Sequence, residues 1–296
     1  MRQDITFSSG SDTCSGWFYL PDAMDAGATL PVIIMAHGLS GVKEQGLDAV
    51  AKRFARGGFA VTVFDFRHFG ASEGDPRGQL FPHDMVEDFR NAITWSCQQP
   101  KVDPKRVGLW GTSYSGGLAT HAATIDRRVK AIVAQVPSII NAEARRAMDP
   151  DRWEAVGKML IADRISRYET GAVRTIPVVA PEGEPCLLPG QESLDFFNAG
   201  SAAPNWRNEI TLESLEKMRE FDPVSLIRML APTALLIIAA ESDSLIPLDA
   251  LRAAFERAGE PKRLVVLPIG HFGVYREPGL TTSIDEALTW YGAHLA

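Results

Sequence analysis

The sequence predicts an α/β fold with a mostly parallel twisted sheet, helices on both faces and an inserted helical segment. Short apolar runs alternate with helical patterns from about residue 31 to residue 136, as parallel strands joined by crossover helices do. The alternation then stops for about ninety residues, which is much longer than a usual connection in a compact fold. We therefore predict a core at residues 1–137 and 223–296 and a helical lid at residues 138–222.

The first thirty residues predict two antiparallel strands. Residues 4–9 (DITFSS) and 16–20 (GWFYL) are strand-like, a turn is expected from Gly10 to Ser15, and Pro21 with Asp22 closes the second strand. The strand–helix alternation follows. Its expected strands are residues 31–36, 59–65, 106–110 and 129–136, and its expected helices are residues 47–57, 83–98 and the segment after Ser113. Such a sheet carries its chemistry at the carboxyl ends of the strands.

The interruption contains its own helical patterns. Residues 152–168 and 211–221 are expected to form helices on either side of a Pro/Gly-rich segment at 177–190. Its aromatic side chains favour a lid over the site rather than a surface excursion; they include Trp153, Phe196, Phe197 and Trp206. The sheet is expected to resume with strands at 232–240 and 263–268 and helices at 248–259 and 283–295.

Composition restricts the class of partner. The 296 residues are 45% hydrophobic and 23% charged, and the net charge of −7 is spread without acidic or basic blocks. We therefore expect neither nucleic acid nor an anionic membrane as a partner, whereas small neutral or lipophilic substrates remain open. The sequence leaves the oligomeric state open, a homo-oligomer included.

The cysteines and the N-terminal residues indicate the compartment. Cys14, Cys97 and Cys186 are odd in number and widely spaced, unlike a disulfide framework or a zinc site. The first ten residues lack the apolar core of a signal peptide, and the longest apolar run is too short to span a bilayer. We expect a cytoplasmic protein.

The stretch GTSYSGG, Gly111 to Gly117, is the most informative motif. A serine on a sharp strand-to-helix turn is exposed beside free amides, and the turn accepts only small residues two positions before and after it. Ser113 fits between Gly111 and Ser115, with Ser115 a departure from the usual glycine. Ser115 fits a second frame, but counting from the expected strand end favours Ser113 as the nucleophile.

A serine nucleophile needs a base and an acid that orients the base. Asp243 follows the strand at 232–240, and His271 follows the last strand, so the order Ser, Asp, His matches this architecture. Glu241 is the alternative acid. The other candidates have structural interpretations: Asp222 as a helix N-cap before proline, His83 as a capping or loop residue, His121 as a helix residue pointing away from the site, and His294 as a surface residue.

The oxyanion that forms on the substrate needs two fixed donors. We expect these to be the backbone N–H groups of Tyr114 and of Leu39, which lies just beyond His37 and Gly38 in AHGLSG. We expect His37 to support that loop rather than to bind metal or act as a second base. No spaced cluster of His, Asp or Glu predicts a metal site, and no cofactor is expected.

With these residues assembled, the chain resembles the α/β-hydrolase superfamily over nearly its full length. The matching motifs are AHGLSG, DFRHFGASEG at 65–74, GTSYSGG, ESD and GHF. Three longer stretches, MAHGLSGVKEQGLD, FDFRHFGASEGDPR and DRRVKAIVAQVP, are similar to bacterial relatives of fungal polyketide thiohydrolases and polyketide transferases. In DFRHFGASEG we expect the pair of Asp65 and Arg67 to hold the loop.

The resemblance implies an α/β-hydrolase fold, a triad of Ser113, Asp243 and His271, and an acyl-enzyme released to water or to another alcohol. It leaves the substrate open, because the lid forms much of the pocket. We expect hydrolysis of a small-molecule carboxylic ester or thioester. Acyl transfer and C–C bond hydrolysis would use the same residues, and a non-catalytic protein that binds a small ligand is the alternative from a different class.

Overall fold

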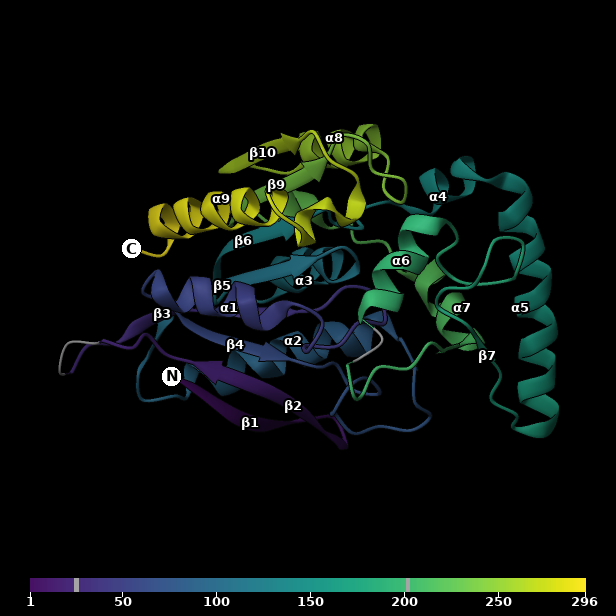
Figure 1. Cartoon of the computed structure of the whole chain (residues 1–296), viewed down its shortest axis with the longest axis horizontal. Helices are drawn as coiled ribbons and strands as arrows, with labels where there is room; N and C mark the ends of the chain where they lie inside the picture. Colours follow the sequence, from purple (N-terminus) through teal and green to yellow (C-terminus); the bar gives the residue numbers. More distant parts are fainter. Residues whose placement is uncertain (24–26, 201–202) are drawn as a thin grey trace.

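The computed structural model describes residues 1–23, 27–200 and 203–296. A twisted sheet forms the centre of the molecule, and Figure 1 shows it flanked by helices. Within the described residues its eight strands lie in the order β1-β2-β4-β3-β5-β6-β9-β10. The strands are β1 (Arg2–Ser9), β2 (Asp12–Tyr19), β3 (Leu30–Ala36), β4 (Ala60–Phe64), β5 (Val102–Thr112), β6 (Val129–Gln135), β9 (Ala234–Ala240) and β10 (Lys262–Leu267).

The first two strands form the antiparallel edge of the sheet. Arg2 of β1 pairs with Tyr19 of β2, and Ser9 pairs with Asp12. Strand β2 then pairs antiparallel with β4, and the pairings from β4 through β10 are parallel. The predicted turn from Gly10 to Ser15 was too long, because β2 already begins at Asp12.

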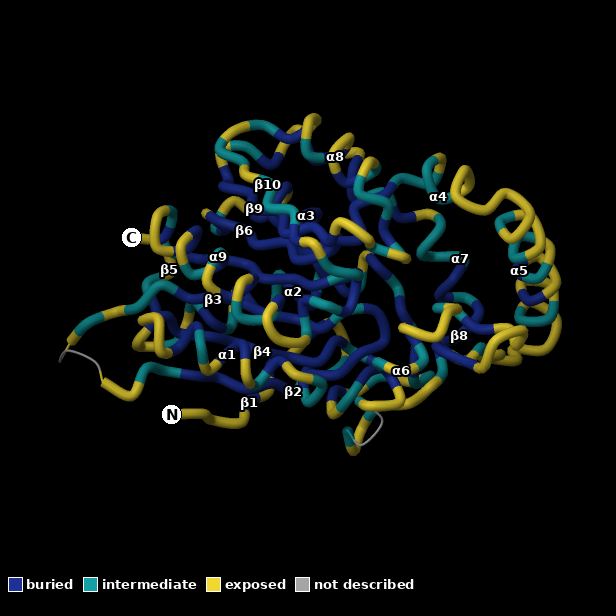
Figure 2. Tube along the Cα trace, turned by 45° about the horizontal axis from the view of Figure 1, so that its top comes forward, coloured by how far each residue is buried: buried dark blue, intermediate teal, exposed yellow. Residues whose placement is uncertain are grey.

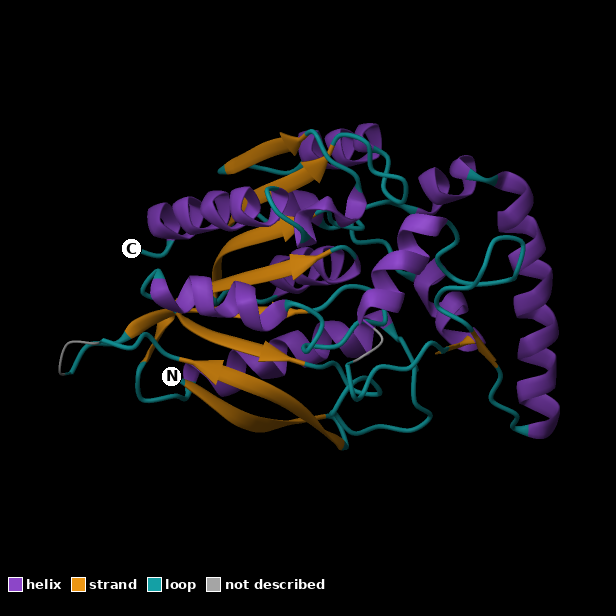
Figure 3. Cartoon of the chain, viewed as in Figure 1, coloured by secondary structure: helices purple, strands orange, loops and turns teal. Residues whose placement is uncertain are grey.

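Two hydrophobic layers cover the parallel strands, because successive side chains of a strand point to opposite faces. In β3, Val32 and Ile34 belong to one core, whereas Ile33 and Met35 belong to the other. Helices α1 (Leu47–Arg56) and α9 (Gly279–His294) cover the second core. Helices α2 (Pro82–Cys97), α3 (Tyr114–Ile125) and α8 (Leu248–Arg257) cover the first. Figure 3 shows this helix–sheet–helix arrangement by secondary structure, which confirms the predicted fold class.

The segment between β6 and β9 forms a separate group of elements at the ends of the parallel strands. In Figure 1 the arrowheads of β5 and β6 point toward this group. It comprises α4 (Ala142–Met148), α5 (Pro150–Thr170), β7 (Thr175–Ile176), α6 (Gln191–Gly200), β8 (Ile210–Thr211), α7 (Leu212–Glu220) and the 3-10 helix η1 (Ile227–Met229). The side where the carboxyl ends of the strands lie therefore faces the insertion.

The predicted helices at 152–168 and 211–221 correspond to α5 and α7. Helices α4 and α6 and the small β7–β8 pair were not predicted. Helix α5 packs against α7 through one face, and Figure 2 shows long exposed stretches on its other side. The proposed division into core and lid stays a prediction. None of the described helices is long and apolar enough to cross a membrane.

Candidate active site

Ser113 lies at the sharp turn between β5 and α3, which we call the elbow. Its backbone has φ 53° and ψ −118°, a conformation that costs a non-glycine residue energy and is concentrated at functional sites. A Cβ on Gly111 would lie 2.3 Å from the carbonyl oxygen of Ser115, so the turn closes only with glycine at 111. The strand extends to Thr112, two residues beyond the predicted end at Trp110, and still delivers Ser113 at its carboxyl end.

Ser115 occupies a different environment from Ser113. Its Oγ is buried, lies 2.9 Å from the carbonyl oxygen of Ala36 and accepts a hydrogen bond from the Thr112 amide at 2.9 Å. The side chain thereby joins the start of α3 to the end of β3. Ser115 is thus a small residue with an engaged hydroxyl, and the structure brings Ser113, not Ser115, to the histidine.

Three side chains from distant parts of the sequence form a hydrogen-bonded chain. Nε2 of His271 lies 3.1 Å from Oγ of Ser113, and Nδ1 of His271 lies 2.8 Å from Oδ2 of Asp243. His271 begins the 3-10 helix η2 (His271–Tyr275) after β10, and Asp243 follows β9. The imidazole is almost completely buried, at 1% exposure. This is the geometry that a serine, a general base and an orienting acid require.

Asp243 is itself held in place. Its Oδ1 accepts hydrogen bonds from the backbone N–H groups of Leu245 at 2.9 Å and Ile246 at 2.8 Å, which leaves Oδ2 for His271. Glu241, the alternative acid, is exposed, and its own backbone N–H bonds to Leu267. The structure therefore brings Asp243, and not Glu241, to the imidazole.

The remaining candidates lie outside this chain of hydrogen bonds. Asp222 accepts from the amides of Val224 and Ser225, so it caps a turn before η1 rather than an α-helix. His83 lies inside α2, not before it, and its ring packs near those of His121 and Phe221.

His121 and His294 differ in their surroundings. The ring of His121 is buried, with its centroid 4.9 Å from that of Phe221, and burial lowers its pKa. The ring of His294 lies against Trp290 at 4.2 Å in the last helix, far along the chain from the elbow.

The two expected oxyanion donors lie beside Ser113. A Cβ on Gly38 would lie 3.3 Å from the Cβ of Ser113, so the loop after β3 passes close to the elbow. Leu39 and Tyr114 line the same cavity as Ser113. Neither backbone N–H has a hydrogen-bond acceptor within the part of the chain that the structure describes. Both amides are free to bind an oxygen at the elbow.

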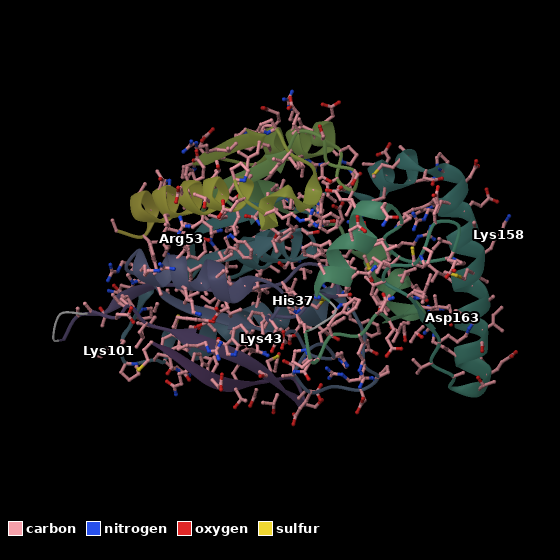
Figure 4. All side chains as sticks on the ribbon, in the orientation of Figure 1. His37, Lys43, Arg53, Lys101, Lys158 and Asp163 are labelled. Atoms are coloured by element: carbon pink, nitrogen blue, oxygen red, sulfur yellow. The ribbon has the colours of Figure 1, made fainter. Side chains whose placement is uncertain are left out.

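His37 supports this loop from within. Its Nδ1 lies 2.8 Å from the Gly38 carbonyl oxygen, and burial lowers its pKa, which favours the neutral ring. Figure 4 shows His37 at the end of the sheet that faces the insertion, with Lys43 nearby. The loop is further fixed by Asp65, which accepts from Nζ of Lys43 at 2.5 Å.

Asp65 and Arg67 hold the loops around the site, as expected, but each forms its ion pair with another residue and not with the other. Arg67 donates to Asp88 of α2, with Nε 2.6 Å from Oδ1, while Asp65 pairs with Lys43. Both ion pairs are buried, and both hold the loops that surround the site.

Two cavities meet at Ser113. The smaller, of about 40 Å³, is lined by His271, the loop after β3 and the aromatic rings of Phe196, Phe197, Phe272 and Tyr275. The larger, of about 350 Å³, extends under α4, α5 and α7 and is lined by Leu39, Tyr114 and several apolar side chains of the insertion, among them Ile140, Val156, Leu187, Leu215 and Met218.

The sequence did not predict the arginines of the larger cavity. Arg145, Arg152 and Arg219 come from α4, α5 and α7 and converge only in the folded chain. Their spacing in the sequence carries no motif, so nothing in the sequence pattern could have identified them. Among the described residues, no group of three or more His, Cys, Asp or Glu side chains could hold a metal ion.

Comparisons with known proteins identify the family and the fold. The family model of X-Pro dipeptidyl-peptidase (S15 family) matches residues 17–150. A thiohydrolase of Aspergillus aculeatus is 33% identical over 79% of this chain and 76% of its own length. A polyketide transferase of Aspergillus fumigatus is 28% identical over 99% of both chains. The solved structure of the α/β hydrolase GrgF from Penicillium superposes with a TM-score of 0.85 at 25% identity, covering 100% of this chain and 99% of that one.

Proposed function

Because this chain belongs to the α/β-hydrolase family that includes the fungal thiohydrolases, we propose that it cleaves a carboxylic ester or thioester through an acyl-enzyme on Ser113. The observation that carries the proposal is the chain of hydrogen bonds from Ser113 through His271 to Asp243, at 3.1 and 2.8 Å. A binding protein would have no need of this arrangement, whereas a serine nucleophile depends on it.

The reaction begins with proton transfer from Oγ of Ser113 to Nε2 of His271 as Oγ attacks the substrate carbonyl carbon. This step needs the tautomer with the proton on Nδ1, which the hydrogen bond to Asp243 favours. The amides of Leu39 and Tyr114 donate to the oxyanion, and each such donor contributes about 2.7–4 kcal/mol in comparable enzymes. The imidazolium is stabilised by the Asp243 carboxylate.

The tetrahedral species then collapses, and the bond from carbon to the leaving oxygen or sulfur breaks. His271 returns its proton to the leaving group, so the leaving group must lie on the side of His271. His271 lines the smaller cavity only. We assign the leaving group to that aromatic cavity and the acyl group to the larger one. Water, deprotonated by the same His271, releases the acid and restores Ser113.

Acyl transfer to an alcohol would use the same acyl-enzyme, with the alcohol in place of water. The similarity of this chain to a polyketide transferase supports acyl transfer as a second candidate function. The two are separated by product analysis: turnover of an ester with added alcohol yields free acid in one case and a new ester in the other.

A fluorophosphonate probe tests the nucleophile. Trypsin leaves both Ser113 and Ser115 in one peptide, from Val107 to Arg127, so fragmentation must locate the adduct within it. We expect the folded protein to carry the label on Ser113. A protein that stays unlabelled, or that carries the adduct on Ser115, would defeat the proposal; the first result would favour a non-catalytic ligand-binding protein.

A further inference from the structure

The larger cavity beside Ser113 carries an excess of positive charge. Three arginines line it, Arg145, Arg152 and Arg219, against one carboxylate, that of Asp149. Asp149 is exposed, and its Oδ1 accepts the backbone N–H of Arg152 as the N-cap of α5. Within the described residues, none of the three arginines forms an ion pair. A cavity that bound only an apolar acyl chain would gain nothing from these charges.

Two of the arginines are held by neutral groups. Nη2 of Arg152 donates to the carbonyl oxygens of Cys186 at 3.1 Å and Leu187 at 3.0 Å. The guanidinium of Arg219 stacks on the ring of Trp153 at 3.7 Å and donates to the Trp153 carbonyl oxygen. These contacts fix the positions of both side chains. Because all the partners are neutral, both positive charges are left without a counter-ion.

Arg145 is different because part of its donor capacity is unused. Its Nη2 donates to Oγ of Ser138 at 2.8 Å, but its Nε is buried and has no hydrogen-bond partner among the described residues. Burial lowers its pKa. Asp222 interacts with it electrostatically from beyond ion-pair distance, with Oδ1 already accepting two backbone amides. A buried donor without an acceptor is costly, so this one is expected to meet a ligand atom.

Tyr114 carries a second unused donor and lines the same cavity. Its hydroxyl is buried and has no partner within the part of the chain that the structure describes, and the hydroxyl and the guanidinium of Arg145 interact electrostatically. Tyr114 follows the nucleophile directly and lines the larger cavity with Arg145. Two unsatisfied donors, one of them cationic, thus point to an anionic group with several acceptor oxygens.

We propose that the enzyme prefers substrates whose acyl group carries a carboxylate, bound by the guanidinium of Arg145 and the hydroxyl of Tyr114. Arg145 is then a specificity-determining residue, with Arg152 and Arg219 adding to the positive potential. This inference rests on the proposed function, in which the acyl group occupies the larger cavity. Arginine suits the role because its planar donors match a carboxylate and its charge persists when buried.

The test compares two series of 4-nitrophenyl esters with matched acyl lengths, from adipate to sebacate. One series ends in a free carboxylate and the other in a methyl group. For the wild-type enzyme we expect kcat/KM to favour the carboxylate at one or more lengths by about ten- to a hundredfold, as a charge-assisted hydrogen bond would give. Equal kcat/KM for the two series at every length overturns the proposal.

Arg145→Gln and its neighbour Arg146→Gln form a matched pair. Arg146 is exposed and lies outside the larger cavity. We expect Arg145→Gln to reduce the preference to near one, mainly through KM for the carboxylate series, and Arg145→Lys to restore part of it. Arg146→Gln should keep the wild-type preference. If Arg145→Gln lowers kcat/KM equally for both series, Arg145 is only structural and the inference is wrong.

A measurement on the wild-type protein covers the case in which Arg145→Gln does not fold. Free dicarboxylates should inhibit turnover of the neutral ester competitively and at least tenfold more strongly than monocarboxylates of equal length. Equal inhibition contradicts the inference. Ser113→Ala separates failure of this inference from failure of the proposed function. If turnover of the neutral esters depends on Ser113 but the wild-type enzyme does not prefer the carboxylate series, only the inference fails. If turnover of the neutral esters does not depend on Ser113, the proposed function fails.

Discussion

The Nδ1 atom of His271 lies 2.8 Å from Oδ2 of Asp243, and the other carboxylate oxygen accepts two backbone amides. The carboxylate is therefore fixed by the loop after β9 before it meets the imidazole. Its position determines which ring nitrogen carries the proton. The base function that we assign to Nε2 of His271 thus depends on a residue that never contacts the substrate.

Asp243→Asn is expected to lower kcat by about 10⁴-fold, because an amide nitrogen facing Nδ1 favours the wrong tautomer of His271. Steady-state turnover of a 4-nitrophenyl ester measures the effect, and the thermal midpoint checks the fold. Glu241→Gln is the control, since Glu241 is exposed two residues earlier. A comparable loss in Glu241→Gln, or near-normal turnover in Asp243→Asn, would show that the acid has been misassigned.

Gly111→Ala is expected to disrupt the elbow. The new Cβ would lie 2.3 Å from a backbone oxygen of α3, and overpacking of this kind costs about 1–3 kcal/mol. Activity should fall together with the free energy of unfolding measured in urea. Gly292→Ala is the matched control, because Gly292 lies in α9 with nothing near its added Cβ. Alanine there should stabilise the helix by about 0.5–1 kcal/mol. An unchanged Gly111→Ala variant would contradict the close packing of the elbow.

His37 is expected to make the folded state sensitive to acid. Burial lowers its pKa, so below about pH 6.5 the unfolded chain binds a proton that the folded chain does not. The free energy of unfolding should then fall on acidification by up to about 1.4 kcal/mol per pH unit, while above pH 6.5 this contribution is constant. Urea titrations at several pH values should show wild type losing stability relative to His37→Gln as the pH falls. A difference that does not vary with pH would argue against a buried neutral His37.

The sequence predicted the parallel core because its signals are local and strong. Apolar runs such as residues 234–240 have the length of buried strands, and in a parallel sheet their carboxyl ends lie at one edge. That regularity was enough to expect Ser113, Asp243 and His271 at the same place. The same regularity was enough to predict that the loop after β3 lies beside the elbow.

The insertion was harder to predict because its packing is not periodic. Helix α4 has no buried residue and α6 begins directly after a Pro/Gly-rich segment, so neither gives a clear helical pattern. The partner of a charged side chain is likewise decided in three dimensions. Arg67 pairs with Asp88 of α2, and Arg145 donates a hydrogen bond to Ser138, and neither contact follows from sequence spacing.

The most direct test of the central claim is the turnover of a short 4-nitrophenyl ester by Ser113→Ala. The substitution removes only the hydroxyl that lies 3.1 Å from Nε2 of His271. We predict that kcat falls by about 10⁴-fold or more while the thermal midpoint stays within a few degrees of wild type. A folded Ser113→Ala protein that retains wild-type turnover would contradict the acyl-enzyme on Ser113.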